Sequence, residues 1–147
     1  MTTEIDQKFR VLQIIYGALF ASLFFYGGGL FLVSKNWDAA SAKGFDNLEF
    51  LVAAVVALGI AASIPILKNI LLGKIQPEWD ATKKLKSFQV AHIVALAMAE
   101  SVLFLGLMAA IILKNRMAIF PFFGFAILLF VVHAPRRALF DQCLRQN

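Results

Sequence analysis

The sequence predicts an all-α integral membrane protein with four transmembrane helices, arranged as two tandem antiparallel hairpins. Of its 147 residues, 61% are hydrophobic and only 16% are charged, and the mean hydropathy is +0.78. The charged residues are bunched, so that long apolar runs separate them. A helix needs about 20 apolar residues to cross the hydrocarbon layer, and the alternating pattern of a membrane β-barrel strand is missing. We therefore expect one four-helix membrane domain over residues 1–147 and exclude a soluble domain.

The four spans follow from the apolar runs and the turn residues between them. They are predicted at about 11–34, 50–72, 88–113 and 117–135. The first follows a segment of mixed charge without a small-residue cleavage site, which predicts an uncleaved anchor. A linker is expected at about 73–87, and a turn of a few residues around Asn115 separates the last two spans.

Lysine and arginine are distributed unevenly between the two sides of the predicted bundle. One side holds Lys8, Arg10, Lys68, Lys74, Lys83, Lys84, Lys86, Arg136, Arg137 and Arg145. The other side holds Lys35, Lys43, Lys114 and Arg116. Because basic loops stay on the cytoplasmic side, we expect both termini in the cytoplasm. The predicted location is a bacterial-type inner membrane or a plasma membrane, crossed several times.

The net charge of +5 indicates a lipid partner and not a nucleic acid. The excess basic residues flank the ends of predicted spans, where anionic headgroups lie. The densest group is Lys83, Lys84 and Lys86 in the predicted cytoplasmic linker. We expect this linker to contact anionic lipids, and the alternative is a basic linker that is merely solvated.

Aligning the sequence with itself at an offset of 79 residues indicates an internal duplication. Residues 9–36 pair with residues 88–115 without a gap, and nine of the 28 pairs are identical. The identical polar and glycine pairs are Ser22 with Ser101, Gly27 with Gly106, Lys35 with Lys114 and Asn36 with Asn115. Both copies begin on the same side of the membrane, which predicts a repeat of parallel orientation.

Glu100 is the one charged residue near the centre of a predicted span. Its counterpart in the duplication is Ala21. A charged side chain at the bilayer centre costs about 2.5–3.5 kcal/mol on insertion scales, and an isolated carboxylate takes up a proton instead. We therefore expect Glu100 to bind a proton or cation. The alternative is a protonated or hydrogen-bonded glutamate that only joins helices.

A local resemblance to a known family supports the first interpretation of Glu100. Residues 97–101 read AMAES and precede an aliphatic run that contains Gly106. This pattern resembles the carboxylate helix of rotor-ring proteolipids, the c subunits of rotary ATPases, over about 17 residues. The resemblance implies that Glu100 binds a proton or sodium ion and that the hydroxyl of Ser101 assists. Unlike that family, this chain has its acid on the first helix of a hairpin and lacks the glycine ladder and the Arg-Gln-Pro turn.

Small residues recur every four positions on three of the predicted spans. They are Gly17 and Ala21 in the first span, Ala53, Ala57 and Ala61 in the second, and Ala91, Ala95 and Ala99 in the third. Small residues let helix backbones approach closely in lipid. We expect these positions and Gly106 to pack helices, either within a compact bundle or against partners in a homo-oligomer or larger complex.

His92 and His133 are expected at similar depth near the cytoplasmic face, on antiparallel spans. Paired imidazoles could ligate haem iron or titrate near neutral pH. Ordinary interfacial histidines with solvent or backbone partners are the alternative. Tyr16 and Tyr26 could reach Glu100 only if the first and third spans touch.

Three functions fit these residues, and none is enzymatic. The spans hold no acid pair, metal-ligand cluster or nucleophile with a nearby base, so we predict no catalytic residue and no metal site. The first function is proton or cation coupling through Glu100. The second is an accessory or assembly subunit of a larger membrane complex, and the third is a small drug or cation exporter. The sequence specifies no cofactor.

Overall fold

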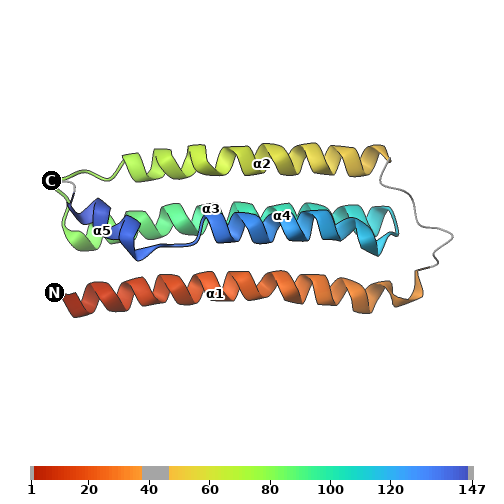
Figure 1. The fold of residues 1–147 in the computed structure, drawn as a ribbon, viewed down its shortest axis with the longest axis horizontal. Coiled ribbons are helices and arrows are strands. Elements are labelled where there is room, and N and C mark those ends of the chain that lie inside the picture. The colour runs from red at the N-terminus through yellow and green to blue at the C-terminus, as the bar shows by residue number, and fades with distance from the viewer. Residues whose placement is uncertain (1, 38–46, 146–147) are drawn as a thin grey trace.

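The computed structural model describes residues 2–37 and 47–145 and contains only helices, turns and connecting segments within those ranges. Its elements are α1 (Thr2–Val33), η1 (Ser34–Asn36), α2 (Leu48–Gly73), α3 (Ala81–Ile112), η3 (Arg116–Ala118), α4 (Ile119–Val132) and α5 (Arg137–Arg145). The long helices run side by side, and the beginning of α1 and helix α5 lie at the same end, which we call the terminal end (Figure 1). The all-α prediction is confirmed, whereas Lys43 lies outside the described residues.

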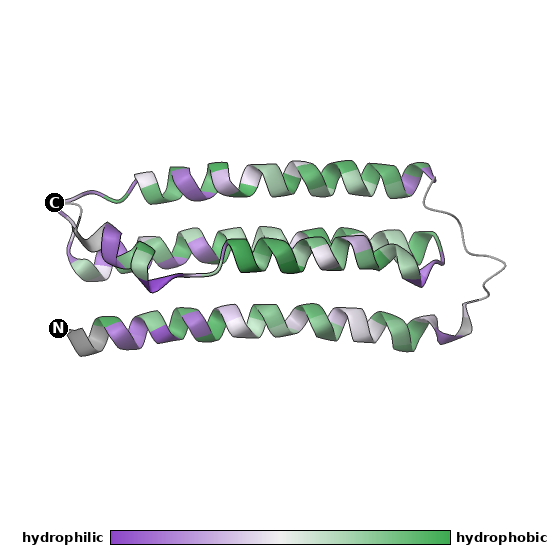
Figure 2. Cartoon of the chain, viewed as in Figure 1, coloured by the Kyte–Doolittle hydropathy of each residue, from purple (hydrophilic) through white to green (hydrophobic). Residues whose placement is uncertain are grey.

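Three helices in the described ranges are long and apolar enough to cross a membrane. They are Ile5–Val33, Leu48–Gly73 and Ala81–Ile112. Figure 2 shows hydrophobic residues along their central parts and hydrophilic residues gathered chiefly at the terminal end. The fourth apolar helix, Arg116–Val132, is shorter. It ends before the predicted boundary at 135 because Pro135 disfavours helical backbone at Ala134.

Helix α3 is the central element of the bundle. It packs most extensively against α2, then against α4 and then against α1. Helices α1 and α2 lie on opposite sides of the pair formed by α3 and α4, and share little direct packing (Figure 1). Helices α3 and α4 therefore form a packed hairpin as predicted, whereas α1 and α2 run antiparallel but each packs on α3. The small residues on α3 explain this arrangement, because they allow close approach from several directions.

Helix α3 begins earlier than the apolar run that predicted it. The carboxylate of Asp80 accepts a hydrogen bond of 2.7 Å from the backbone N–H of Lys83, which satisfies a donor of the first turn. Helix α3 therefore includes Lys83, Lys84 and Lys86, which the sequence had placed in the linker. The segment between α2 and α3 shrinks from the predicted 73–87 to residues 74–80.

A tight turn at Asn115 joins α3 to α4, at the position predicted. Lys114 has a φ of 50°, and the side-chain oxygen of Asn115 accepts a hydrogen bond of 3.0 Å from the backbone N–H of Met117. This Asn side chain replaces a helical carbonyl and starts the next helical turn. The short connection holds α3 and α4 as neighbours, so the apolar face of α4 packs directly on α3.

Gly106 is a point of close approach between α3 and α4. A Cβ atom added there would lie 2.7 Å from Cγ and 2.9 Å from Cδ2 of Phe122. At Gly27, the counterpart of Gly106 in the duplication, an added Cβ would lie 3.6 Å from Cε2 of Phe123, an ordinary contact. Gly106 therefore has no space for a Cβ atom, whereas Gly27 has, and the two glycines can be compared by the same substitution to alanine.

We expect Gly106→Ala to lower the free energy of unfolding by about 1–3 kcal/mol, because α4 must shift to admit the methyl group. Gly27→Ala should change it by about 0.5 kcal/mol or less. Unfolding of the purified protein in mixed micelles, followed by circular dichroism during a titration with a denaturing detergent, measures both. Equal effects of the two substitutions would contradict the close approach at Gly106.

Candidate functional site

Glu100 on α3 meets Ser22 on α1 near the middle of the bundle. The hydroxyl oxygen of Ser22 lies 2.7 Å from Oε1 of Glu100 and 2.6 Å from the carbonyl oxygen of Leu19. Both side chains are partly buried. Helices α1 and α3 run in the same direction (Figure 1), which brings positions 78 residues apart to the same level.

The hydroxyl group of Ser22 has one proton but two oxygen neighbours, on Glu100 and on Leu19. A serine hydroxyl carries one proton, and a backbone carbonyl oxygen can only accept. When Ser22 donates to Leu19, its contact with Glu100 is a hydrogen bond only if a protonated carboxyl group donates to the serine oxygen. When Glu100 is ionised, its oxygen and the carbonyl of Leu19 compete for one proton. The two contacts form a continuous chain of hydrogen bonds when a protonated carboxyl group donates to Ser22, and an ionised Glu100 instead accepts the proton of Ser22 in competition with Leu19.

Ser101 does not take part in this arrangement. Its hydroxyl donates to the carbonyl oxygen of Met98 at 2.7 Å, within its own helix. Ser22 instead provides the hydroxyl beside Glu100. The sequence interpretation did not select Ser22 as a site residue. The signal was present in the alignment at offset 79, which pairs Ser22 with Ser101 and predicts helices that run in parallel.

Helices α1 and α3 pack against each other, but Tyr16 and Tyr26 of α1 contact residues other than Glu100. The hydroxyl of Tyr16 donates to the carbonyl oxygen of Phe130 on α4, at 3.4 Å. The ring of Tyr26 lies 4.8 Å from that of Phe104, one helical turn beyond the pair of Ser22 and Glu100. Phe104 is still 41% exposed. The seam between α1 and α3 therefore opens on the outer surface of the bundle, beside Glu100.

The small residues predicted to pack helices divide into two groups. Those on α2 and α3 face the core, fully buried at Ala57, Ala91, Ala95, Ala99 and Gly106 and partly buried at Ala53 and Ala61. In contrast, Gly17 and Ala21 on α1 are exposed. A Cβ atom added at Gly17 would meet nothing within 4 Å in the described part of the chain. This stripe of α1 does not contribute to packing within the chain.

The two histidines lie on segments that approach the terminal end, His92 on α3 and His133 just after α4. His92 is fully buried, its Nδ1 lies 2.9 Å from the carbonyl oxygen of Phe88, and the two rings are 4.1 Å apart. Because a carbonyl only accepts, Nδ1 carries the proton of this hydrogen bond. Nε2 is buried without a hydrogen-bond partner among the described residues. His133 follows α4 and is 9% exposed. Haem ligation and pH sensing by this pair stay predictions.

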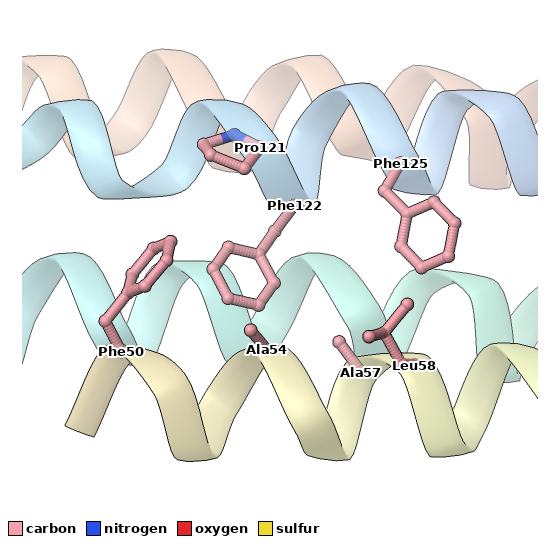
Figure 3. Close-up of a pocket in the computed structure, with 7 residues that line it drawn as sticks. All are labelled: Phe50, Ala54, Ala57, Leu58, Pro121, Phe122 and Phe125. Atoms are coloured by element: carbon pink, nitrogen blue, oxygen red, sulfur yellow. The ribbon is translucent and has the colours of Figure 1, made fainter. Parts of the chain in front are cut away.

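An apolar groove of about 220 Å³ lies between α2 and α4, away from these polar residues. Figure 3 shows Phe50, Ala54 and Leu58 of α2 facing Phe122 and Phe125 of α4 across it. Its lining side chains are apolar, so the groove has the character of a contact surface for hydrocarbon chains. In residues 2–37 and 47–145, no three His, Cys, Asp or Glu side chains are grouped to hold a metal ion.

Comparison with known proteins gives no relative for this chain. No family model, no curated protein and no solved structure matches it. The resemblance of residues 97–113 to rotor-ring proteolipids therefore stays a prediction, and the function must be argued from the contacts of Glu100.

Proposed function

We propose that this chain is a small integral membrane protein in which Glu100 binds a proton at mid-membrane depth and couples its movement, or that of a cation, across the bilayer. The observation that carries this proposal is the pair of short contacts made by Ser22, to Glu100 and to Leu19. A protonated Glu100 can donate to Ser22 while Ser22 donates to Leu19, and an ionised Glu100 instead accepts from Ser22, so the contacts accommodate both states.

Magnitudes favour a functional Glu100 over a purely structural one. Placing a charged side chain at the bilayer centre costs about 2.5–3.5 kcal/mol, whereas a hydrogen bond between membrane helices contributes about 0.6 kcal/mol on average. One interhelical hydrogen bond therefore does not offset the cost of an ionised carboxylate, and that cost is relieved when the group takes up a proton or a cation. An ionisable group at this position is explained by its ability to gain and lose a proton.

In this proposal the chain crosses the membrane four times, with both termini in the cytoplasm. Helical segment Arg116–Val132 follows the tight turn directly and would rise about 25 Å, close to the roughly 30 Å of the hydrocarbon layer. The excess of lysine and arginine at the terminal end supports the orientation. Glu100 would then lie far from both aqueous phases, reached along the seam between α1 and α3.

The proposal predicts that a membrane-permeant carbodiimide labels Glu100, because the reagent attacks protonated carboxyl groups in apolar surroundings. The purified protein is treated over a pH series, and the labelled peptide is identified by mass spectrometry. Labelling should fall as the pH rises, and sodium should protect if Glu100 also binds that ion. Absence of labelling at every pH would mean a sealed glutamate and would overturn the proposal.

Two serine variants provide the controls for this labelling experiment. Ser22→Ala removes the hydroxyl that contacts Glu100 and should move the pH at which labelling falls. Ser101→Ala removes a hydroxyl that bonds to Met98 and should leave the labelling profile unchanged. Glu100→Gln should lose the label altogether, which assigns it to this side chain.

A second candidate function is an accessory or assembly subunit of a membrane complex. The exposed stripe at Gly17 and Ala21 favours it, because small residues on a lipid-facing surface allow another helix to approach closely. This candidate predicts co-purification with a partner at fixed stoichiometry. Isolation as a free monomer under mild solubilisation would argue against it.

A further inference from the structure

A groove of about 160 Å³ lies between α1 and α4, near the end of the bundle where α3 turns into α4, which we call the turn end. Phenylalanine rings of both helices form its walls, and two adjacent glycines of α1 also line it. These residues are Phe24, Phe31, Phe120, Phe123, Gly27 and Gly28. Three of the four rings remain exposed, so the groove opens on the outside of the bundle.

Two aromatic pairs bound this groove along the helix axes. The ring centroids of Phe24 and Phe123 are 5.5 Å apart, and those of Phe31 and Phe120 are 5.8 Å apart. A Cβ atom added at Gly28 would meet nothing within 4 Å in the described part of the chain. Phe24 and Phe31 are separated by seven residues, or about 10 Å of helix, whereas one hydrocarbon leaflet is about 15 Å thick. The groove therefore fits within a single leaflet.

A cation lies at the turn end of the groove. The guanidinium group of Arg116 is 5.9 Å from the ring centroid of Phe31, which is within the range of a cation–π contact. Phe120 and Phe123 follow Arg116 by four and seven residues in the same helical segment, a spacing that places them on one face. Arg116 is exposed and forms no ion pair with any residue in 2–37 or 47–145. Its N–H donors therefore remain available to an anion beside the groove.

We propose that this groove binds one acyl chain of an anionic glycerophospholipid, whose phosphate group pairs with Arg116. Acyl chains run along the membrane normal, as the helices that form the groove do. The phosphate oxygens accept hydrogen bonds, and the planar guanidinium group presents donors in a matching geometry. A helix of a second copy is about 10–12 Å wide with its side chains. It does not enter a hollow of about 160 Å³ that is bounded by ring pairs.

The groove between α2 and α4 provides a comparison within the same chain. It is also apolar, with a volume of about 220 Å³, but the residue before Phe50 at its turn end is the acid Glu49. An anionic headgroup is therefore favoured beside Arg116 and disfavoured beside Glu49. The proposal does not involve Glu100. It needs only that α1 crosses the membrane, as its length and composition allow.

The test combines lipid titration with photochemical labelling of the full chain in mixed micelles. Native mass spectrometry counts the bound phosphatidylglycerol or phosphatidylcholine. We expect preference for phosphatidylglycerol, and Arg116→Gln should bind it about fivefold more weakly. Phosphatidylglycerol with a diazirine group in one acyl chain should label residues 24–31 and 119–123 on irradiation. Gly28→Leu places a side chain in the groove and should remove this labelling.

Matched variants separate this site from misfolding and from general charge. Gly59→Leu makes the same substitution on α2, where an added Cβ would also meet nothing within 4 Å among the described residues, and should keep the labelling. Arg116→Lys keeps the charge and should keep the preference for phosphatidylglycerol. Lys114→Gln removes an exposed charge at the same end and should weaken binding by less than about twofold.

Three outcomes would overturn the proposal. Labelling spread evenly over all exposed segments would mean that no groove is preferred. Equal weakening by Arg116→Gln and Lys114→Gln would mean that the headgroup responds only to general charge. A dimer in native mass spectra that Gly28→Leu dissociates would assign the groove to a second copy of the chain.

Discussion

Truncating Phe140 to alanine is expected to lower the free energy of unfolding by about 3–5 kcal/mol. Phe140 on α5 is fully buried, with its ring 5.3 Å from that of Phe88 on α3 and 6.0 Å from that of Phe9 on α1. The substitution would leave a cavity where three helices meet. Denaturing-detergent titration monitored by circular dichroism measures the loss, and limited proteolysis should show earlier cleavage within α5.

The adjacent Leu139→Ala provides the control for Phe140, because Leu139 is 41% exposed. It should change stability by about 1 kcal/mol or less. Arg137 also links α5 to α1 through Asp6 at 2.6 Å, and its hydrogen bonds to Asp6 and Asp141 raise the pKa of Arg137. These ion pairs are exposed and add little. If Phe140→Ala and Leu139→Ala lowered the free energy of unfolding by the same small amount, the packing of Phe140 on Phe9 and Phe88 would not be what holds helix α5 in place.

The helices could be predicted from the sequence because length and apolar composition alone determine which segments suit a membrane. The boundaries were less predictable, since a helix continues beyond its apolar part wherever a cap permits, as at Asp80. Beyond the hairpin of α3 and α4, the pairing of helices was not predictable, because it depends on which small-residue surfaces meet. Ala95 and Ala99 are buried, whereas Ala21, with the same spacing from Gly17, is exposed.

In the candidate site, too, residue type and position could be read from the sequence, whereas contacts between helices could not. Glu100 could be selected from its charge and position in the chain, since both are visible in the sequence. Its partner was harder to select, because Ser22 and Ser101 are equally polar and only the parallel course of α1 and α3, which the alignment at offset 79 predicts, places Ser22 beside the acid. Likewise His92 and His133 could be placed near one end from their positions in the chain, but the full burial of His92 and the end of α4 just before His133 depend on how the helices pack.

If Glu100 couples proton movement as proposed, Glu100→Gln is expected to abolish that movement while leaving the bundle intact. The amide N–H group of glutamine can donate to the hydroxyl oxygen of Ser22, so the contact between α1 and α3 survives. The stability change should stay below about 1 kcal/mol. Proton influx into liposomes that hold the purified protein, driven by a potassium diffusion potential and read by a trapped pH-sensitive dye, measures the loss. Ser101→Ala should conduct as the unmodified chain does.

Glu100→Leu separates a functional acid from a structural one most sharply. Leucine removes the hydrogen bond to Ser22, worth about 0.6 kcal/mol on average between membrane helices, and places an apolar side chain of similar size at the same position. Ser22 keeps a partner, because its hydroxyl still donates to Leu19. An acid retained for proton binding therefore predicts a leucine variant whose free energy of unfolding stays within about 1 kcal/mol of that of the unmodified chain, yet without proton flux. A loss of more than about 2 kcal/mol, or wild-type flux in Glu100→Gln, would instead make Glu100 a link between α1 and α3.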